Sequence, residues 1–360
     1  MLGTDIAIDL GTYAIKLFVN GQGVTVHEPS VVTIDTEKNQ VTAVGKKAYE
    51  MLGRTGNRLR VERPLQNGVI SNFDLAQYLV SHYIHELGAK KMVMPRVVVS
   101  VPCNITEVEK RAVVDSISAA GVRKICLIQE PIAAAMGAGI DISSPHGVLV
   151  VDIGCGTTDM AVLSLRGVSN SKIVKIAGQN FDEAIARFIR NKYHLQIGER
   201  MAEACKIAIG GVLPRTDFVT TFTAKGKDTE NGLPAWAEVT SEEVLEAMTE
   251  PAMDIIHAVQ KLMEETDPEL LGDVFSDGII LTGGSAKIYG FADLLSKHVG
   301  MPVKIAEDPE LCVALGKEAR RNYQSFECCL LKLSKKKPQT ENSPSAASFY
   351  KLLLKFIVRA

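Results

Sequence analysis

Two short motifs, separated by about the length of a domain, constrain the fold of this chain more than any other feature. Asp9-Leu10-Gly11 and Asp152-Ile153-Gly154 each connect two apolar, strand-like segments. The layout of strands and helices around the first motif recurs around the second. Alternating strands and helices predict α/β units, and the repeat predicts two similar domains that face each other across a cleft.

The first motif has the composition of a phosphate-binding turn. Gly11 allows backbone N–H groups to approach an anion, and Thr12 adds a hydroxyl donor. Lys16, in the strand that follows, adds a cation. Asp9 ends the preceding strand, where its carboxylate can hold Mg²⁺ through bound water. Taken alone, such a motif is also the pattern of an ordinary tight turn.

The second motif repeats this design with more polar groups. It continues as Cys155-Gly156-Thr157-Thr158-Asp159, which offers two glycines and two threonines to a γ-phosphate. Asp152 corresponds to Asp9 and is the second candidate for water-mediated Mg²⁺ binding.

A third glycine turn follows the apolar segment GIIL and precedes a helix. Here backbone can lie against a nucleoside and a helix N-terminus can face phosphate. The predicted nucleotide contacts in this turn are Gly283, Gly284, Ser285 and Ala286. Together, the three turns favour a nucleotide site over three unrelated turns.

The order of these motifs is similar to that in the superfamily of actin, heat-shock chaperone and sugar-kinase ATPases. Within it, the chain most resembles MreB, the bacterial rod shape-determining family. The resemblance covers residues 4–319 and rests on HEPSVV (27–32), MLGRT (51–55), RPLQNGVISNFD (63–74), PRVVVSVP (95–102), IQEPIAAAMGAG (128–139), VDIGCGTTDMAV (151–162), FDEAI (181–185) and AEDPELCVALG (306–316).

The resemblance implies the actin-like ATPase fold. Two similar α/β domains of ribonuclease H-like topology each carry a small inserted subdomain, with a nucleotide cleft between them. The implied boundaries are 1–32, 66–138 and 310–323 for subdomain IA, 33–65 for IB, 139–180 and 247–309 for IIA, and 181–246 for IIB. Residues 324–360 are expected to form a flexible basic tail with a C-terminal amphipathic helix.

The resemblance also assigns roles to single residues. Glu130 corresponds to the residue that positions or activates the hydrolytic water, and Thr157 assists near the γ-phosphate. A glutamate before a proline also fits a simple helix cap. Glu203 and Lys206, at i and i+3, match side chains near ribose and adenine, although a surface ion pair has the same spacing. Gly178 matches a glycine beside the nucleotide, with a strand-end turn as the alternative.

Three positions depart from the family pattern. Tyr13-Ala14 replaces the usual Ala-Asn in the first turn, where both residues are still expected to contact the nucleotide. Cys155 replaces a glycine, and Gln129 replaces a common Glu. None of these changes removes a group that nucleotide binding needs. Cys155 does add a side chain to a tight loop, which bears on the hydrolysis rate.

The implied function is that of a cytoskeletal protein. Such a chain is expected to bind ATP with Mg²⁺, to hydrolyse ATP slowly, and to polymerise into paired filaments. The expected location is cytoplasmic, on the inner face of the cell membrane, where filaments and membrane proteins of the cell-shape complex organise cell-wall synthesis. Nucleic acid is not among the expected partners. The alternative is a non-filamentous ATPase of the same superfamily, chaperone-like or a small-molecule kinase.

Two segments predict contact with a membrane. In the first, two lysines precede three apolar residues where the family has an exposed apolar loop, namely Met92, Val93 and Met94. A buried loop is the alternative there.

The second segment lies within residues 320–360. These residues carry nine Lys or Arg and two Glu, a net charge of +7, which leaves a net charge of −9 for residues 1–319. Its basic amphipathic helix has the apolar stripe Phe349, Leu352, Leu353 and Phe356. Docking on the protein's own body is the alternative for this tail.

Composition argues against a secreted or membrane-spanning body. The seven cysteines include no CxxC pair, which predicts reduced thiols in a cytoplasm. The first residues lack the pattern of a signal sequence. No window reaches the roughly 18–20 uncharged apolar residues of a spanning helix.

Overall fold

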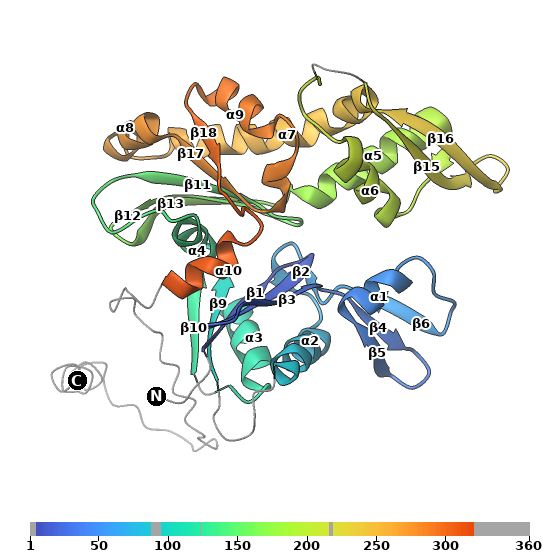
Figure 1. Ribbon diagram of the computed structural model, residues 1–360, viewed down its shortest axis with the longest axis horizontal. Helices are drawn as coiled ribbons and strands as arrows, with labels where there is room; N and C mark the ends of the chain where they lie inside the picture. Colours follow the sequence, from blue (N-terminus) through green and yellow to red (C-terminus); the bar gives the residue numbers. More distant parts are fainter. Residues whose placement is uncertain (1–4, 88–94, 123, 216–218, 320–360) are drawn as a thin grey trace. The chain divides into compact units, whose positions relative to one another are not determined.

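The computed structural model describes residues 5–87, 95–122, 124–215 and 219–319, which belong to one compact unit of the chain (Figure 1). The residues predicted to contact a membrane, at 92–94 and 349–356, lie outside these ranges. Among the helices described, none is both long enough and apolar enough to cross a membrane.

The first large sheet combines an antiparallel hairpin with two parallel strands. Its order is β10-β9-β1-β2-β3, with β1 pairing antiparallel to β2 and parallel to β9. The strands are β1 (Asp5–Leu10), β2 (Ala14–Val19), β3 (Gly23–Pro29), β9 (Arg96–Val101) and β10 (Lys124–Gln129). Two helices, α2 (Phe73–Glu86) and α3 (Glu107–Ser118), share one hydrophobic core with these strands.

The second large sheet repeats this topology strand for strand. Its order is β13-β12-β11-β17-β18, and β11 pairs antiparallel to β12 and parallel to β17. The strands are β11 (Val148–Ile153), β12 (Thr158–Ser164), β13 (Gly167–Val174), β17 (Ile279–Thr282) and β18 (Val303–Ile305). The helices of its core include α5 (Gly178–Tyr193), α7 (Ser241–Glu264), α8 (Pro268–Asp277) and α9 (Phe291–Val299). The repeat confirms the predicted actin-like fold class.

Smaller sheets accompany each large sheet. One has the order β5-β4-β6, and the other has the order β14-β15-β16. The first contains β4 (Val32–Asp35), β5 (Gln40–Val44) and β6 (Leu59–Glu62), next to α1 (Gly45–Met51). The second contains β14 (Leu195–Gln196), β15 (Thr221–Asp228) and β16 (Pro234–Thr240), next to α6 (Glu199–Ile209). The subdomain boundaries stay a prediction.

Two short helices, α4 (Glu130–Gly137) and α10 (Cys312–Ala319), lie between the two large sheets (Figure 1). Their backbones approach so closely that glycine is required at the contact. A Cβ at Gly137 would lie 1.9 Å from the Cys312 carbonyl oxygen, and one at Gly316 would lie 1.7 Å from that of Ala133. A separate core cluster forms here from α4, Val313 of α10 and strands of the second sheet.

Capping boxes fix the first residues of two helices, α3 and α7. The Thr106 side chain and Glu109 form a capping box at the start of α3. At α7 the N-cap is Thr240, which forms the capping box with Glu243. Ser241 is the first helical residue, and its hydroxyl accepts a hydrogen bond from the Thr220 N–H.

Candidate functional site

The turn between β1 and β2 is held by its own backbone and by a neighbouring hairpin. Gly11 N–H donates to the Ala14 carbonyl at 3.2 Å, and a Cβ at Gly11 would lie 2.8 Å from that oxygen. Thr12 Oγ1 accepts a 2.9 Å hydrogen bond from the N–H of Gly68. Gly68 belongs to the turn between β7 (Leu65–Gln66) and β8 (Val69–Ile70). Because a hydroxyl both accepts and donates, the Thr12 O–H can still donate to a ligand.

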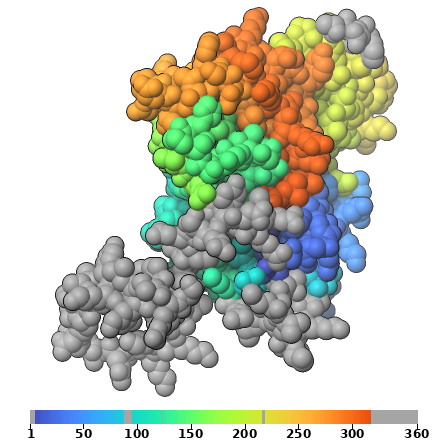
Figure 2. All heavy atoms as spheres, turned by 60° about the vertical axis from the view of Figure 1, so that its left-hand side comes forward, coloured from blue at the N-terminus to red at the C-terminus, as the bar shows by residue number. Residues whose placement is uncertain are grey.

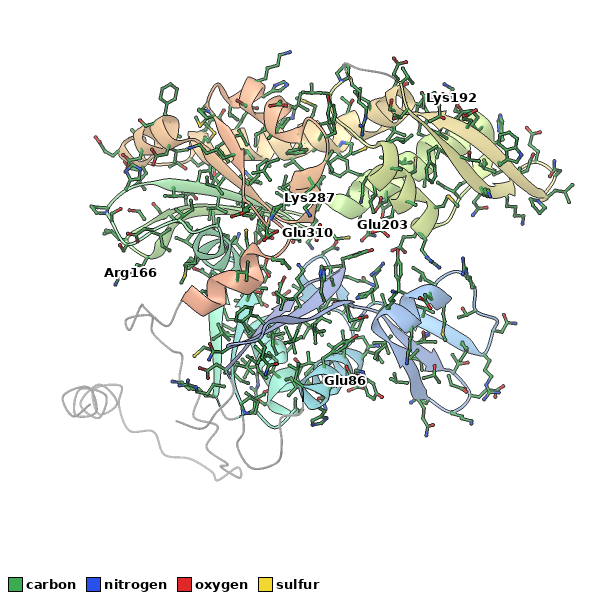
Figure 3. The ribbon with its side chains drawn as sticks, in the orientation of Figure 1. Glu86, Arg166, Lys192, Glu203, Lys287 and Glu310 are labelled. Atoms are coloured by element: carbon green, nitrogen blue, oxygen red, sulfur yellow. The ribbon has the colours of Figure 1, made fainter. Side chains whose placement is uncertain are left out.

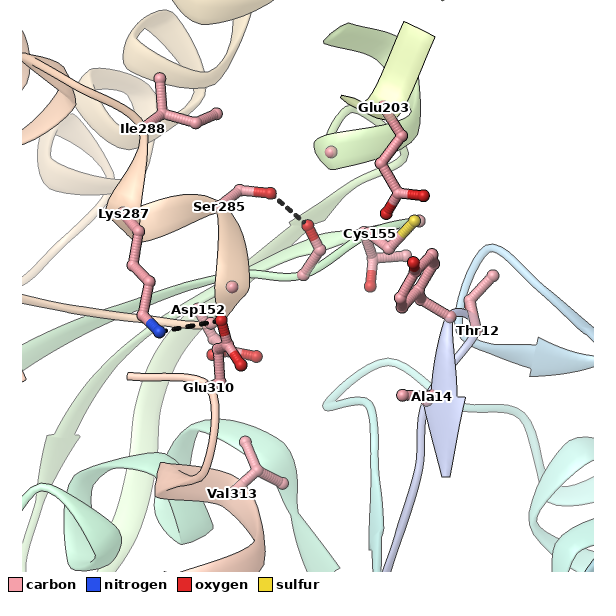
Figure 4. A pocket seen from close by; sticks show the side chains of 18 of the residues that line it. Thr12, Ala14, Asp152, Cys155, Glu203, Ser285, Lys287, Ile288, Glu310 and Val313 are labelled. Carbon is pink, nitrogen blue, oxygen red and sulfur yellow. Dashed lines mark hydrogen bonds and ion pairs between the residues drawn. The ribbon is translucent and has the colours of Figure 1, made fainter. Parts of the chain in front are cut away.

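The turn between β11 and β12 faces the first turn. A Cβ at Gly156 would lie only 3.0 Å from Thr12 Oγ1. The Gly154 carbonyl accepts hydrogen bonds from the Gly178 N–H at 3.1 Å and from the Ser285 hydroxyl at 2.8 Å (Figure 4). These bonds join the second turn to the start of α5 and to the third glycine turn.

The third turn follows β17 and leads into a short 3-10 helix, η1 (Gly284–Lys287). Gly283 has a φ of +85°, and a Cβ there would lie 2.3 Å from the carbonyl oxygen of Ile153. The Gly283 N–H donates to the Pro309 carbonyl at 2.8 Å. Glycine therefore allows this turn to lie directly against the end of β11.

A cavity of about 600 Å³ lies among the three turns. It contains Glu130 and all the predicted nucleotide contacts except Ala286, namely Asp9, Gly11, Thr12, Tyr13, Ala14, Lys16, Asp152, Gly154, Cys155, Gly156, Thr157, Gly178, Glu203, Lys206, Gly283, Gly284 and Ser285. Ala286 does not line the cavity, because its side chain is fully buried in the hydrophobic core. Residues far apart in sequence thus meet at one site.

Two buried carboxylates occupy equivalent positions in the two sheets. Asp9 and Asp152 each stand one residue before the end of their strand. Burial raises the pKa of Asp152 to about 6, a shift that the Thr282 hydroxyl, bonded to it at 2.6 Å, opposes and that Asp9 reinforces. Lys16 supplies a cation beside Asp9, with its Nζ 3.1 Å from Asp9 Oδ2. A bound cation would stabilise the ionised forms of the two buried carboxylates.

Two further ionisable side chains, Lys16 and Asp159, lie beside these carboxylates. Burial lowers the pKa of Lys16, but the Asp9 carboxylate outweighs burial, so that the pKa lies above its usual value. Lys16 also donates to the Glu310 carbonyl at 2.8 Å. Asp159, paired with Asp152 across β11 and β12, has a pKa raised to about 7 by burial and by Asp152. Within the described ranges, no cluster of three or more metal-ligating side chains occurs.

Glu130 faces the cavity from the start of α4. The N-cap of this helix is Gln129, and Glu130 is the first helical residue. Glu130 therefore lies in the first turn of α4 and not at its N-cap, and its role toward water stays a prediction. Thr157, its predicted assistant, lines the same cavity from the second turn.

The two predicted nucleoside contacts on α6 have separate partners. Lys206 Nζ donates to the Gly178 carbonyl at 2.9 Å and to Asp182 Oδ2 at 2.8 Å. Glu203 accepts a hydrogen bond from the Tyr49 hydroxyl. In the part of the chain that the structure describes, Glu203 and Lys206 form no ion pair with each other, contrary to the surface-pair alternative.

Sequence reasoning missed a further set of lining residues. Lys287 Nζ lies 2.9 Å from Glu310 Oε1 (Figure 4), and the Arg215 guanidinium stands 4.7 Å from the centroid of the Tyr289 ring. The missed residues are Leu10, His27, Gly68, Ile207, Gly210, Arg215, Lys287, Ile288, Tyr289, Glu310 and Val313. Extending the third turn by one helical turn would have found Lys287 to Tyr289. Glu310 lies within the quoted segment 306–316, whereas no quoted motif contains Arg215.

Two duplicated α/β sheets whose glycine turns face each other across one cavity define the actin-like class of proteins. The family model described as MreB/Mbl protein matches residues 3–326, and the chain belongs to this family.

Individual relatives agree with this assignment. The cell shape-determining protein Mbl of Bacillus cereus is 42% identical over 317 residues, which are 88% of this chain and 95% of the relative. The cell shape-determining protein MreB of Escherichia coli is 42% identical over 322 residues, 88% of this chain and 92% of the relative. Among solved structures, MreB5 of Spiroplasma citri bound to ADP is similar with a TM-score of 0.85 and 34% identity, covering 89% of this chain and 96% of MreB5.

Proposed function

We propose that this chain binds ATP in the cavity among the three turns, hydrolyses it slowly, and polymerises into filaments that determine cell shape. The observation that carries the proposal is the facing pair of glycine turns at equivalent places in two duplicated sheets. The similar MreB5 structure holds bound ADP, which supports a nucleotide as the ligand. Membership of a family whose relatives are called cell shape-determining supports the cytoskeletal role.

In this proposal Asp9 and Asp152 hold Mg²⁺ through water. The raised pKa of Asp152 fits such a site, because burial disfavours the ionised carboxylate and a bound cation would favour it. Mg²⁺ commonly keeps several waters and takes its remaining ligands from one or two carboxylates and substrate phosphates. When bound, it would neutralise charge on the phosphates, and Lys16 would add a second cation from β2.

The hydrolytic step is proposed to use Glu130. Its carboxylate orients the water that attacks the γ-phosphorus and accepts a proton from it, the bond from phosphorus to the β–γ bridging oxygen breaks with its electron pair going to ADP, and inorganic phosphate leaves with ADP retained. Thr157 and the backbone N–H groups of the two turns hold the phosphate oxygens. The contribution of the protein is thus mainly positioning and charge compensation.

Beyond the cavity, the proposal places paired filaments on the cytoplasmic face of the cell membrane. The partners would be further copies of this chain and the membrane proteins that synthesise the cell wall. The apolar residues at 92–94 and the basic segment at 338–360 are proposed as membrane contacts, on the basis of their sequence alone.

Glu130→Gln tests the catalytic assignment. We expect the rate of phosphate release to fall by about 10²-fold or more, because the variant cannot accept a proton from water. ATP affinity should change little, since the amide has the same shape. Phosphate release and equilibrium binding of ATP are measured on the same preparation.

Glu86→Gln provides a matched control for Glu130→Gln. Glu86 is exposed on α2 and lies well away from Glu203 and Glu310 of the cavity (Figure 3). Its substitution should leave both measurements unchanged. Full phosphate release by Glu130→Gln would rule out the proposed role of this carboxylate.

A chain that ends at residue 337 tests the membrane segment. Co-sedimentation with liposomes that contain anionic lipid should fall relative to the full chain, because the truncation removes three cations and the apolar stripe. Equal binding by both chains would show that this segment does not contact the bilayer.

A further inference from the structure

Two tyrosine hydroxyls meet one carboxylate beside the cavity. The Tyr49 hydroxyl donates to Glu203 Oε2 at 2.5 Å, and the Tyr13 hydroxyl interacts with both Glu203 and Tyr49. The two rings lie edge to face, with centroids 6.2 Å apart. Tyr13 and Glu203 line the cavity itself. The cluster is therefore part of the wall of the nucleotide site.

The members of this cluster come from three separate elements. Tyr13 lies in the turn between β1 and β2, Tyr49 lies in α1, and Glu203 lies in α6. Figure 4 shows Glu203 extending from its helix toward the turn that carries Thr12. The cluster thus connects the first turn and α1, in the first half of the compact unit, with α6 in the second half.

Salt bridges and cations reinforce the same connection. Arg63 Nη2 lies 2.5 Å from Glu199 Oε1 of α6, and its guanidinium stands 5.3 Å from the centroid of the Tyr13 ring. Arg200 of α6 stands 5.2 Å from the centroid of the Tyr49 ring. Cations on the ring faces leave the hydroxyl ends of both tyrosines for the Glu203 carboxylate.

Both tyrosine hydroxyls stay protonated and therefore act as hydrogen-bond donors. Burial, assisted by Glu203, raises the pKa of Tyr49 to about 12 and moves the pKa of Tyr13 further in the same direction. Both hydroxyls therefore keep their protons at physiological pH. A carboxylate has about four acceptor sites, so Glu203 can accept from both tyrosines and still accept from a ribose hydroxyl.

We propose that Tyr13 and Tyr49 are positioning residues that hold the Glu203 carboxylate for the ribose and fasten α6 to α1 and the first turn, so that nucleotide release requires their hydrogen bonds to break. This inference rests on the proposed nucleotide function. The alanine that is usual in the family at position 13 has no hydroxyl, so Tyr13 gives this chain a bond that an alanine there cannot make.

Tyr13→Phe and Tyr49→Phe test the inference in the full chain, because each removes one hydroxyl and keeps the ring. The probe is 1,N6-etheno-ATP, which carries its fluorophore on the base and leaves the ribose free. Stopped-flow fluorescence measures its dissociation rate after dilution into excess ATP. We expect dissociation to be about tenfold faster in Tyr49→Phe, which corresponds to about 1.4 kcal/mol, and faster in Tyr13→Phe as well.

Tyr193→Phe is the matched control. Its hydroxyl donates to Glu243 Oε1 at 2.7 Å, so the same type of bond is lost in α5, away from the cavity lining. Its dissociation rate should equal that of the unaltered chain. If Tyr193→Phe raised the dissociation rate as much as Tyr49→Phe does, the effect would be a general loss of rigidity. That result would overturn the inference.

A double-mutant cycle separates positioning from a structural effect. Tyr49→Phe should accelerate dissociation little in a Glu203→Gln background, because both changes weaken the same bond. Fully additive effects would contradict the inference. If the unaltered chain does not bind etheno-ATP, the proposed function itself fails. If it binds and the two Phe variants release it at the unaltered rate, only the role of the tyrosines is wrong.

Discussion

Single glycines fix the geometry of the cavity where a side chain would strike backbone. Gly283 combines a φ of +85° with a Cβ position 2.3 Å from the Ile153 carbonyl oxygen. A Cβ at Gly11 would likewise meet the Ala14 carbonyl at 2.8 Å. Such contacts cannot relax by a side-chain rotation, because the obstructing atoms belong to neighbouring strands. The close packing of turns against strands therefore depends on residue identity at these points.

Gly283→Ala should lower the free energy of unfolding by more than about 2 kcal/mol, because the substitution combines a strained φ with a clash against β11. Gly272→Ala is the matched control. Gly272 lies within α8 with open space around it, where alanine should add up to about 1 kcal/mol of helix stability. Urea unfolding of both variants gives the comparison, and equal stability would contradict this account of the turn.

At the scale of elements, α8 is joined to the segment before β11 by a histidine between two carboxylates. His146 Nδ1 lies 3.2 Å from Asp273 Oδ1, and His146 Nε2 lies 2.7 Å from Asp277 Oδ2. Figure 2 shows the face where the orange α8 region borders the green segment around β11 and β12. The hydrogen bond with Asp277 and the nearby negative charges raise the pKa of His146 above its usual 6.5.

His146→Asn should therefore lower stability in a pH-dependent way. A raised histidine pKa stabilises the folded state fully below about 6.5, and this contribution is lost as pH rises through the higher folded pKa. We expect His146→Asn to cost about 0.5–1 kcal/mol at pH 5.5, the scale of exposed ion pairs, and much less at pH 9. Thermal melting across this range measures the difference.

The exposed His257 of α7 supplies a control for this substitution, since no ion pair of His257 occurs among the described residues. A cost of His146→Asn that is the same at both pH values would show that the carboxylates do not act on the histidine charge.

Element patterns explain which parts of the fold were predictable. The duplicated motifs and the strand-turn-strand units are local signals, and the structure contains each of them. At the start of α7, Thr240 and Ser241 are both good caps, and only Thr240 lies three residues before Glu243, so that it forms the capping box. Arg215 was not predictable, since no quoted motif contains it and only the fold brings it over the Tyr289 ring. Glu310 lies in the quoted segment 306–316, but its contact with Lys16, 294 residues away, is set by the fold.

At the scale of the whole molecule, the duplication turns two ordinary hairpin turns into one site. Each turn alone offers a few backbone donors, a carboxylate and a threonine. Facing each other, they enclose a cavity of about 600 Å³ that is lined by the buried carboxylates Asp9 and Asp152 and by Lys16. Nucleotide and metal ion bound there would contact both halves at once, which gives the ligand a physical means to change how the protein presents its surface to another copy.

Electron microscopy of negatively stained full chain, incubated with Mg²⁺, ATP and anionic lipid, tests the central claim most directly. The account predicts paired filaments on the lipid with ATP and far fewer without nucleotide. A chain that binds ATP yet stays monomeric under these conditions, and transfers the γ-phosphate to a small molecule, would contradict it.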